Sequence, residues 1–313
     1  MAQEVIVVCG GLSHEREVSL ESGHRVAREL THAGFSVTTS DFQPSLVELI
    51  QTLDHPVVFP MLHGGAGEDG AVREVLELIG VPYVGTNAVS CRASFDKALA
   101  IPRVAHAGLS VPKRVVLPQD MFRDLGAMTL LTLIEDRLGL PLFVKPSSSG
   151  SALGASRVDR IEDLPAALVN AYSFGRVAVV EEFIAGVEVA VPVFDLGAGP
   201  IAFPPVEIRP ASGVYDFEAR YTAGATTYVC PAEVSDASIE ACKDMAVRAH
   251  ITLGLRDFSR ADIIVRDGQP VFIESSVAPG MTETSLVPLS LETAGEHFAD
   301  VLGELVRLAA DRD

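Results

Sequence analysis

Through the first third of the chain, short apolar runs of strand length alternate with segments that have the apolar period of a helix. We expect strands at 5–8, 35–38, 57–61 and 81–84, and between them a helix carrying Val18, Val26 and Leu30 and further helices at 46–53 and 69–79. Strands that are separated by helices pair in parallel, because a parallel crossover needs a dozen or more residues. The alternation therefore predicts a doubly wound parallel sheet in an N-terminal α/β domain.

The rest of the chain is richer in strands. We expect helices at 92–107, 129–138, 236–253 and 290–310, and strands at 114–117, 142–144, 177–182, 187–194, 201–208, 260–266 and 270–276. Antiparallel sheets with helices on one face are α+β in character. The sequence thus predicts an α/β domain over 1–95, a central α+β lobe over 96–183 and a C-terminal α+β lobe over 184–313, with binding sites between them.

The charge of the chain excludes several classes of protein. Its 313 residues include 42 Asp and Glu against 24 Lys and Arg, for a net charge of −18, so neither nucleic acid nor an anionic membrane is an expected partner. No stretch reaches the roughly 18 uncharged apolar residues of a membrane span, and no export signal precedes the first strand. Four cysteines without a C-x-x-C spacing suit a reducing compartment. We expect a folded cytoplasmic protein.

The segment 141–154 has the composition of a phosphate-binding loop. Lys145 ends an expected strand and is followed by four serines and two glycines. Backbone N–H groups and hydroxyls of such a loop can bind phosphate oxygens, and a lysine beside it can neutralise them. The alternative is a flexible surface loop. Only four lysines stand against twenty arginines, which favours a need for a compact ammonium at Lys97 and Lys145.

A hairpin near the C-terminus combines acidic and basic residues around the turn dipeptide Asp267-Gly268. A strict two-residue turn would leave Glu274 on the face opposite Asp262. A three-residue loop with a glycine bulge would instead pair Asp262 with Glu274, and Arg260 with Ser276. The second register predicts an oxygen-rich site for Mg²⁺ beside an arginine, whereas the alternative is a hairpin with solvent-facing charges.

Two glycine-rich polar stretches, 10–19 and 63–70, each follow an expected strand and precede an expected helix. They should therefore lie at the carboxyl ends of parallel strands, where open α/β sheets bind ligands. His63 taken alone is more often a structural residue than a functional one. No G-x-G-x-x-G follows the first strand, which disfavours a nicotinamide dinucleotide site.

Taken together, these motifs resemble the D-alanine–D-alanine ligases of the ATP-grasp superfamily, in order and over nearly the whole chain. The matching segments are 10–20, 63–70, 90–97, 144–146, 181–188, 215–221, 260–262 and 274–286. The resemblance implies that the two α+β lobes form an ATP-grasp fold. It also implies amino-acid substrates and a homodimer.

The resemblance further implies ATP and Mg²⁺ as cofactors. Lys97 and Lys145 would hold the phosphates under the 147–154 loop, while 181–188 would line adenine and ribose. The implied ATP-binding residues are Lys97, Lys145, Ser149, Glu181, Glu182, Ile184, Glu188 and Arg220. The implied metal ligands are Asp262, Glu274 and Ser276. Mn²⁺ could replace Mg²⁺, and a monovalent cation could also bind.

The implied reaction transfers the γ-phosphoryl group of ATP to the first amino acid, and the second amine then attacks the acyl phosphate. Glu15 would bind the first ammonium group, in a hydrogen-bonded group with Ser151 and Tyr221. Arg260 and the Gly280 amide would stabilise the tetrahedral oxyanion. The implied substrate-binding residues are His63, Ser285 and Leu286, the last two at the second carboxylate.

Three positions depart from the family pattern: Ser276 replaces an asparagine metal ligand, Arg220 replaces a lysine, and Ile101 replaces a frequent lysine. Tyr221 favours an amine acceptor, because depsipeptide-forming members resemble one another in having phenylalanine there. The sequence therefore predicts a D-alanine–D-alanine ligase of peptidoglycan synthesis. The alternatives are a ligase of the same family for other amino acids in a specialised pathway and a nucleotide-binding protein without turnover.

Overall fold

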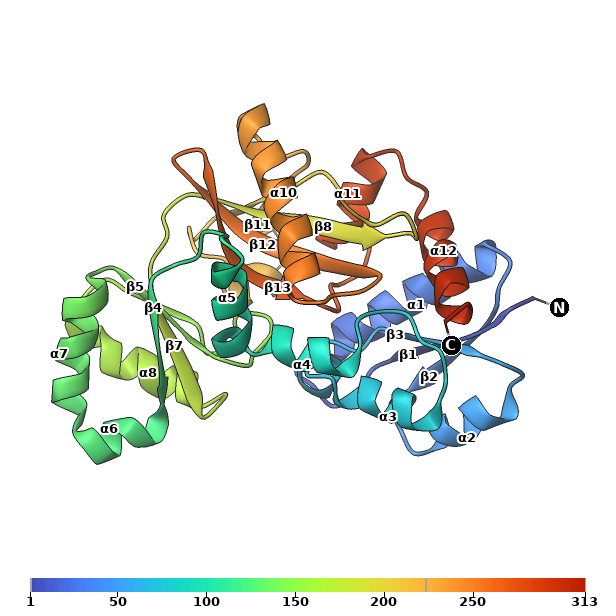
Figure 1. The fold of residues 1–313 in the computed structure, drawn as a ribbon, viewed down its shortest axis with the longest axis horizontal. Helices are drawn as coiled ribbons and strands as arrows, with labels where there is room; N and C mark the ends of the chain where they lie inside the picture. The colour runs from blue at the N-terminus through green and yellow to red at the C-terminus, as the bar shows by residue number, and fades with distance from the viewer. Residues whose placement is uncertain (1, 223, 313) are drawn as a thin grey trace.

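The computed structural model describes residues 2–222 and 224–312, which form three sheets (Figure 1). In the N-terminal sheet, β1 (Glu4–Cys9) lies between β2 (Ser36–Asp41) and β3 (Val57–Pro60), and all three strands are parallel. Helices cover both faces. On one face lie α1 (Arg16–His32) and α12 (Phe298–Ala310), and on the other α2 (Ser45–Thr52) and α3 (Ala71–Ile79). The predicted parallel α/β domain is confirmed.

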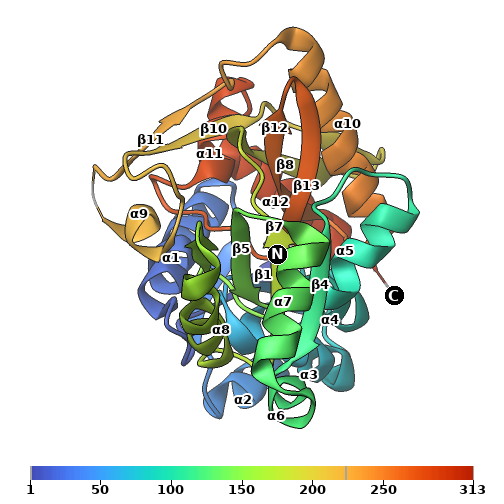
Figure 2. The ribbon, with the colours of Figure 1, turned by 90° about the vertical axis from the view of Figure 1, so that its left-hand side faces the viewer.

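The central lobe has an antiparallel sheet in the order β4-β7-β5-β6, with its helices on one face (Figure 2). The strands are β4 (Arg114–Pro118), β5 (Leu142–Pro146), β6 (Ser156–Val158) and β7 (Val177–Glu182). The helices are α6 (Gln119–Leu125), α7 (Ala127–Leu138) and α8 (Leu164–Tyr172), which follows the short 3₁₀ turn Ile161–Asp163. Among the described residues, the buried core of this lobe comes from residues between 131 and 180, with partly buried apolar residues from 115 onward packed against it.

The C-terminal lobe has a sheet in the order β11-β10-β8-β12-β13, with β9 on part of β8. Its strands are β8 (Val187–Asp195), β9 (Pro200–Ala202), β10 (Val206–Pro210), β11 (Thr226–Val229), β12 (Phe258–Arg266) and β13 (Gln269–Ser276). The helix α10 (Asp236–Thr252) packs on this sheet, joined by α4 (Ala88–Phe95) and α5 (Lys97–His106), while α11 (Leu286–Thr293) packs on β8 and β10. The helix α9 (Phe217–Tyr221) lies between β10 and β11, and a 3₁₀ turn spans Gly65–Gly67. Among the described residues no helix is long and apolar enough to span a membrane.

Several predicted elements are divided in the structure. The helix expected over 92–107 is two helices, because Asp96 has an extended backbone and caps α5 with its side chain. The helix expected over 290–310 is broken at Gly295, whose φ of +80° ends α11. The strand expected over 201–208 is the pair β9 and β10, and the one over 81–84 is reduced to a single bridge at Tyr83. The elements α6, β6, α8, α9 and β11 were not predicted.

The hairpin of β12 and β13 has the predicted pairing for a different reason. Asp262 pairs with Glu274, and Arg260 with Ser276. The turn is nevertheless a strict two-residue turn, since Arg266 pairs with Gln269, and the register shifts in the strands, between positions 262 and 263 of β12. The bulge expected at the turn therefore lies inside the ladder.

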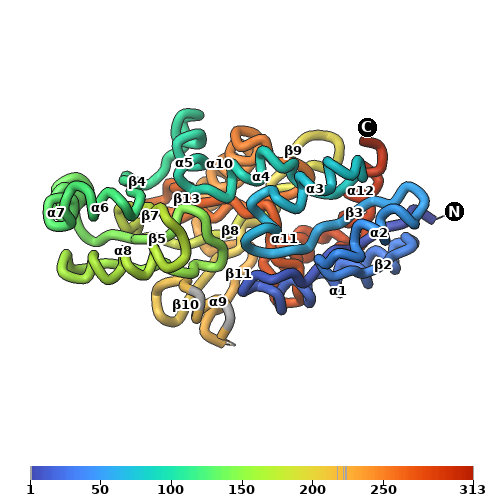
Figure 3. Tube along the Cα trace, turned by 90° about the horizontal axis from the view of Figure 1, so that it is seen from below, coloured from blue at the N-terminus to red at the C-terminus, as the bar shows by residue number. Residues whose placement is uncertain are grey.

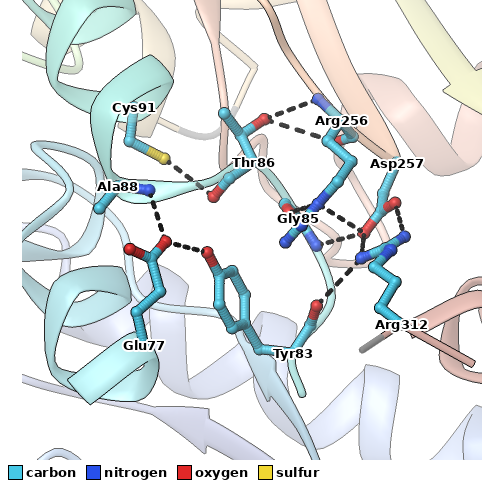
Figure 4. Close-up of polar contacts among 9 residues, drawn as sticks. All are labelled: Glu77, Tyr83, Gly85, Thr86, Ala88, Cys91, Arg256, Asp257 and Arg312. Atoms are coloured by element: carbon cyan, nitrogen blue, oxygen red, sulfur yellow. Dashed lines mark hydrogen bonds and ion pairs between the residues drawn. The ribbon is translucent and has the colours of Figure 1, made fainter. Parts of the chain in front are cut away.

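A buried polar network joins the N-terminal domain to the C-terminal lobe (Figure 4). Asp257, whose φ is +66°, accepts a hydrogen bond of 2.6 Å from the Gly85 N–H and pairs with Arg312 through both carboxylate oxygens. Arg256 donates to the Gly85 carbonyl at 2.7 Å, and its guanidinium lies 4.9 Å from the centre of the Tyr83 ring. The network fixes the two residues before β12 against the N-terminal domain, to which α12 also returns (Figure 3).

Candidate active site

Two cavities meet where the three parts of the molecule come together. The larger, of about 740 Å³, lies between the start of α1, the 63–68 loop and the C-terminal lobe. The smaller, of about 340 Å³, lies between β5 and β7 of the central lobe and the hairpin of the C-terminal lobe. Residues shared by both walls are Lys97, Ser149, Tyr215, Arg220 and Glu274. A ligand in one cavity can therefore contact a ligand in the other.

A buried ion pair lies in the wall of the smaller cavity. Lys145 leaves β5 beside β7, and its Nζ lies 2.6 Å from Oε1 of Glu181. Both side chains are less than a tenth exposed. The second carboxylate oxygen of Glu181 is buried without a hydrogen-bond partner, although a buried acceptor is normally satisfied. This oxygen is therefore available to a ligand that carries an N–H group.

The remaining wall of the smaller cavity combines polar and apolar side chains. Glu182, Ile184 and Glu188 all line it, as the sequence interpretation requires of a nucleotide site. Burial raises the pKa of Glu188 to about 7, and the nearby carboxylates of the hairpin act in the same direction, against Arg220. Sequence reasoning missed Arg157, which stacks at 4.3 Å on the ring of Phe183. No motif pointed to that residue.

Lys97 connects the glycine-rich loop to the hairpin. Its Nζ donates to the Ser149 carbonyl at 2.8 Å and lies 3.1 Å from Oε2 of Glu274. Its backbone N–H donates to the Ser147 carbonyl at 2.8 Å, and Asp96 accepts a bond from the Ser147 hydroxyl. The start of α5 is thus attached to the loop, and the ammonium group points to the junction of the cavities.

The hairpin supplies the oxygen atoms predicted to hold a metal. Arg260 forms two hydrogen bonds of 2.7 Å with the carboxylate of Asp262, two residues along the same strand. Burial raises the pKa of Glu274, but the ammonium groups of Lys97 and Lys145 lower it more, to about 2. Glu274 is therefore ionised at neutral pH.

These donors suit Mg²⁺, which takes one or two carboxylates and keeps several waters or phosphate oxygens. Asp262 lines the smaller cavity, Ser276 the larger one, and Glu274 both. The Ser276 hydroxyl also accepts a bond of 3.4 Å from the Ala278 N–H. Within 2–222 and 224–312, no three His, Cys, Asp or Glu side chains form a metal site by themselves, so phosphate oxygens would have to complete the coordination.

Of the predicted residues on α9, Arg220 is described fully and Tyr221 in part. Arg220 lies on α9, where its guanidinium stacks at 4.4 Å on the ring of Tyr215. Its Nε is buried without a hydrogen-bond partner. The side chain of Tyr221, predicted to join Glu15 and Ser151, lies outside the described part of the structure, so its contacts stay a prediction.

Glu15 lies at the opposite end of the larger cavity, at the start of α1. It accepts a hydrogen bond from the Ser151 hydroxyl, which brings the two predicted residues together from different lobes. Glycines at 64 and 150 allow this approach, because a Cβ at Gly64 would come within 2.2 Å of the Glu15 carboxylate and one at Gly150 within 3.0 Å. The glycine-rich loop thus covers the Glu15 end of the cavity.

His63 lies in the wall of the larger cavity, with both ring nitrogens bonded to protein atoms. Its Nδ1 donates to the Ala278 carbonyl at 2.8 Å, and its Nε2 lies 3.2 Å from the Ser22 hydroxyl. Burial lowers the pKa of His63, so the ring is neutral and carries its proton on Nδ1. The side chain predicted to bind substrate also links the N-terminal domain to the segment after β13, and its contact with a substrate stays a prediction.

A buried carboxyl group that sequence reasoning missed lies next to Glu15. Burial raises the pKa of Glu68 to about 7, and the charge of Glu15 acts in the same direction. Glu68 accepts a bond of 2.8 Å from the Gly64 N–H and lines the cavity. Its signal was present in the sequence, since it belongs to the glycine-rich stretch 63–70.

The segment between β13 and α11 completes the larger cavity. Gly280 lies against Ser285, whose Oγ would be 2.9 Å from a Cβ at position 280. The Ser285 hydroxyl accepts a bond of 2.9 Å from the Thr282 N–H. Leu286, the first residue of α11, is buried beside it. Gly280, predicted for the oxyanion together with Arg260 of β12, and the residues predicted for the second carboxylate therefore lie on one short segment in the wall of the cavity that Glu15 also lines.

Comparison with known proteins gives matches over the whole chain. Family models described as D-ala D-ala ligase N-terminus and C-terminus match residues 40–86 and 104–307. A protein of Desulforudis audaxviator named D-alanine--D-alanine ligase is 37% identical over 315 residues, covering all of both chains. One of the same name from Pelotomaculum thermopropionicum is 36% identical, covering 99% of this chain and 98% of its own.

Solved structures match as well. The VanG D-Ala:D-Ser ligase from Enterococcus faecalis is similar with a TM-score of 0.84 at 29% identity, covering 99% of this chain and 100% of that one. The D-alanine--D-Alanine ligase from Bacillus anthracis complexed with ATP is similar with a TM-score of 0.82 at 26% identity, covering 98% and 97%.

Proposed function

Because this chain belongs to the D-alanine–D-alanine ligase family of the ATP-grasp superfamily, we propose that it joins two molecules of D-alanine at the expense of ATP. The single observation that carries this proposal is the junction of the two cavities at Lys97 and Glu274. A nucleotide in the smaller cavity would direct its terminal phosphate to the amino acids in the larger one. We further propose, from the family, a role in peptidoglycan precursor synthesis in the cytoplasm and a homodimer, and domains bounded at 1–95, 96–183 and 184–313.

In this proposal the smaller cavity binds ATP. The unpartnered oxygen of Glu181 accepts a bond from the amino group of adenine, because that oxygen lacks a donor in the protein. Glu188 accepts bonds from the ribose hydroxyls. Lys145 and Lys97, together with the N–H groups of the serine-rich loop around Ser149, neutralise the phosphates. Arg220, with its unpartnered Nε, adds a further donor at the junction.

Asp262 and Glu274 would hold Mg²⁺, with the Ser276 hydroxyl as a more distant ligand. When bound, the ion would neutralise phosphate oxygens during transfer. Both carboxylates are paired with cations of the protein, Arg260 and Lys97. For Glu274 the lysines lower the pKa, which favours the ionised form of this ligand.

The reaction has two steps. A carboxylate oxygen of the first D-alanine attacks the γ-phosphorus, the bond to the β–γ bridging oxygen breaks, and ADP leaves with that oxygen. The neutral amine of the second D-alanine then attacks the carbonyl carbon of the acyl phosphate. The resulting oxyanion collapses, the carbon–oxygen bond to phosphate breaks, and inorganic phosphate leaves, while the amine proton passes to solvent or a base.

The residues of this chain bind and orient the reactants in these steps. Glu15 pairs with the ammonium group of the first D-alanine. The Ser151 hydroxyl orients the Glu15 carboxylate by its hydrogen bond and holds the serine-rich loop closed over it. Arg260 and the Gly280 N–H stabilise the oxyanion as it forms. Ser285 and Leu286 receive the second carboxylate at the start of α11. Closure of the serine-rich loop excludes water, which would hydrolyse the acyl phosphate.

The second candidate is a ligase of the same family that uses another amino acid. Ser276 and Arg220 favour it, because Arg220 lies at the junction, Ser276 lies in the wall of the larger cavity, and both differ from the family pattern. One structural relative is named a D-Ala:D-Ser ligase, so proteins with this fold are named for more than one acceptor amino acid.

ADP release by the purified protein with ATP, Mg²⁺ and D-alanine, together with mass spectrometry of the product, tests the proposal. D-alanyl-D-alanine is the expected product. Turnover only with D-serine or another amino acid would favour the second candidate. ATP binding without ADP release for any amino acid would instead indicate a nucleotide-binding protein without turnover.

A further inference from the structure

The segment from Ala278 to Thr282 is held by the N-terminal domain at three backbone positions. His63 donates to the Ala278 carbonyl at 2.8 Å, and Ser22 accepts a bond of 3.0 Å from the Met281 N–H. Arg25 donates through Nη1 to the Thr282 carbonyl at 2.5 Å. The segment therefore does not rely on its own strand and helix for its position. Three side chains from outside the C-terminal lobe fix it.

Arg25 is itself rigidly placed. Only 16% of its side chain is exposed, and its guanidinium lies 4.9 Å from the centre of the Phe298 ring. Its second terminal nitrogen is 3.5 Å from Glu283, whose side chain is 68% exposed. The contact with Glu283 is thus open to water and weak, whereas the bond to the Thr282 carbonyl is charge-assisted and partly buried.

The helix α1 carries Glu15 and two of these contact residues on one face. Glu15 precedes its first residue, and Ser22 and Arg25 follow at intervals of seven and three residues. In a helix of 3.6 residues per turn these positions share one face. Val18 lies on the same face, 3.8 Å from a Cβ at Gly280. One rigid helix therefore sets the position of Glu15 and of the segment that carries Gly280.

From this geometry, and resting on the proposed function, we propose that Arg25 is a positioning residue for the acceptor amino acid. By holding the Thr282 carbonyl it fixes the Gly280 N–H and the start of α11, where the second carboxylate binds. Ser22 and His63 hold the other end of the same segment. The smaller cavity, in which we propose that ATP binds, is lined by other residues. The effect of Arg25 is therefore confined to the amino-acid substrates.

The test compares Arg25→Met with Arg28→Met. Arg28 is on the same helix, is 53% exposed and contacts the same Glu283 carboxylate at 2.8 Å, but makes no bond to the segment. Both substitutions remove one positive charge beside Glu283, and only the first removes the bond to the Thr282 carbonyl. Loss of a hydrogen bond from a charged donor predicts a roughly tenfold higher KM for the acceptor D-alanine in Arg25→Met. The KM for ATP should stay within twofold.

Two measurements decide the outcome. The D-alanine dependence of ADP release separates the constants of the two amino-acid sites, and hydrogen exchange reports the amides of residues 280–286 without requiring turnover. Arg25→Met should raise the acceptor KM and speed exchange about tenfold, Arg25→Lys should restore part of both, and Arg28→Met should leave both unchanged.

Equal effects in the two methionine variants, unchanged exchange in Arg25→Met, or a parallel rise of the KM for ATP would overturn the inference. Failure of the wild-type protein to use D-alanine would refute the proposed function instead. The exchange measurement would then still decide whether Arg25 holds the segment.

Discussion

Replacing Glu274 by glutamine keeps the shape of the side chain and removes one negative charge from the junction of the two cavities. The pKa of Glu274 is lowered from 4.5 to about 2, since Lys97 and Lys145 outweigh the effect of burial. Each tenfold change in the acid dissociation constant corresponds to about 1.4 kcal/mol, so nearby positive charges favour the carboxylate by about 3 kcal/mol. The two lysines oppose a cation at these oxygens, but a divalent ion also interacts with the carboxylate charge, which glutamine lacks. Loss of this ligand should cost at least the roughly 10- to 100-fold in metal affinity that is typical for loss of a supporting group at a metal site, so we expect Glu274→Gln to weaken Mg²⁺ binding by at least about 10-fold.

The assay is ADP release at saturating ATP and D-alanine as the Mg²⁺ concentration is raised. Glu188→Gln provides the control, because it also replaces a buried carboxyl group in the wall of the smaller cavity, but Glu188 is not one of the proposed Mg²⁺ ligands. We expect its Mg²⁺ half-saturation to match that of the wild type. A Glu274→Gln protein with wild-type rate and half-saturation would refute the metal assignment and the reasoning from charge.

Three further outcomes are expected. Lys145→Met should raise the KM for ATP and lower the free energy of unfolding by about 3–5 kcal/mol, because it leaves the buried Glu181 carboxylate without its cation. In thermal unfolding, the double variant with Glu181→Leu should recover stability, but it should not recover ATP binding. The pKa of Glu188 is about 7, so its carboxylate forms as the pH rises from 6 to 8, and the KM for ATP should fall over that range. An equally steep dependence of this KM on pH in Glu188→Gln would assign the pH dependence to another group. Ser276→Asn should leave ADP release intact or raise it, and total loss of turnover would show that the hydroxyl has a different role.

The sequence predicted the N-terminal domain well because its pattern is local. Strands of the parallel sheet are buried on both faces and appear as unbroken apolar runs, as at Val5–Val8. The boundaries that were wrong depend on single backbone conformations. The extended backbone of Asp96 divides one expected helix and the left-handed Gly295 ends another, although the apolar period continues through both. The edge strand β11 and the short helix α9 have no strong pattern of their own.

The sequence indicated those residues of the candidate site whose side-chain type itself points to a chemical role. Lys97 and Lys145 stood out in an arginine-rich chain, and the pairing of Asp262 with Glu274 followed from the hairpin. The bulge was nevertheless expected at the turn, whereas the structure has it inside the ladder. Arg25 could not be found, since nothing in a helical arginine reveals that residue 282 lies beside it. Contacts between distant segments are set by the packing of the domains.

The cores of the three parts are not equally independent. The core beneath the N-terminal sheet includes Phe194, Phe258 and Leu305, so part of the C-terminal lobe packs into the first domain, whereas the rest of that lobe has a separate core under α10. Among the described residues, the core of the central lobe contains residues of that lobe alone, between 115 and 180. The central lobe can therefore accumulate substitutions in its core without repacking the interior beneath the N-terminal sheet.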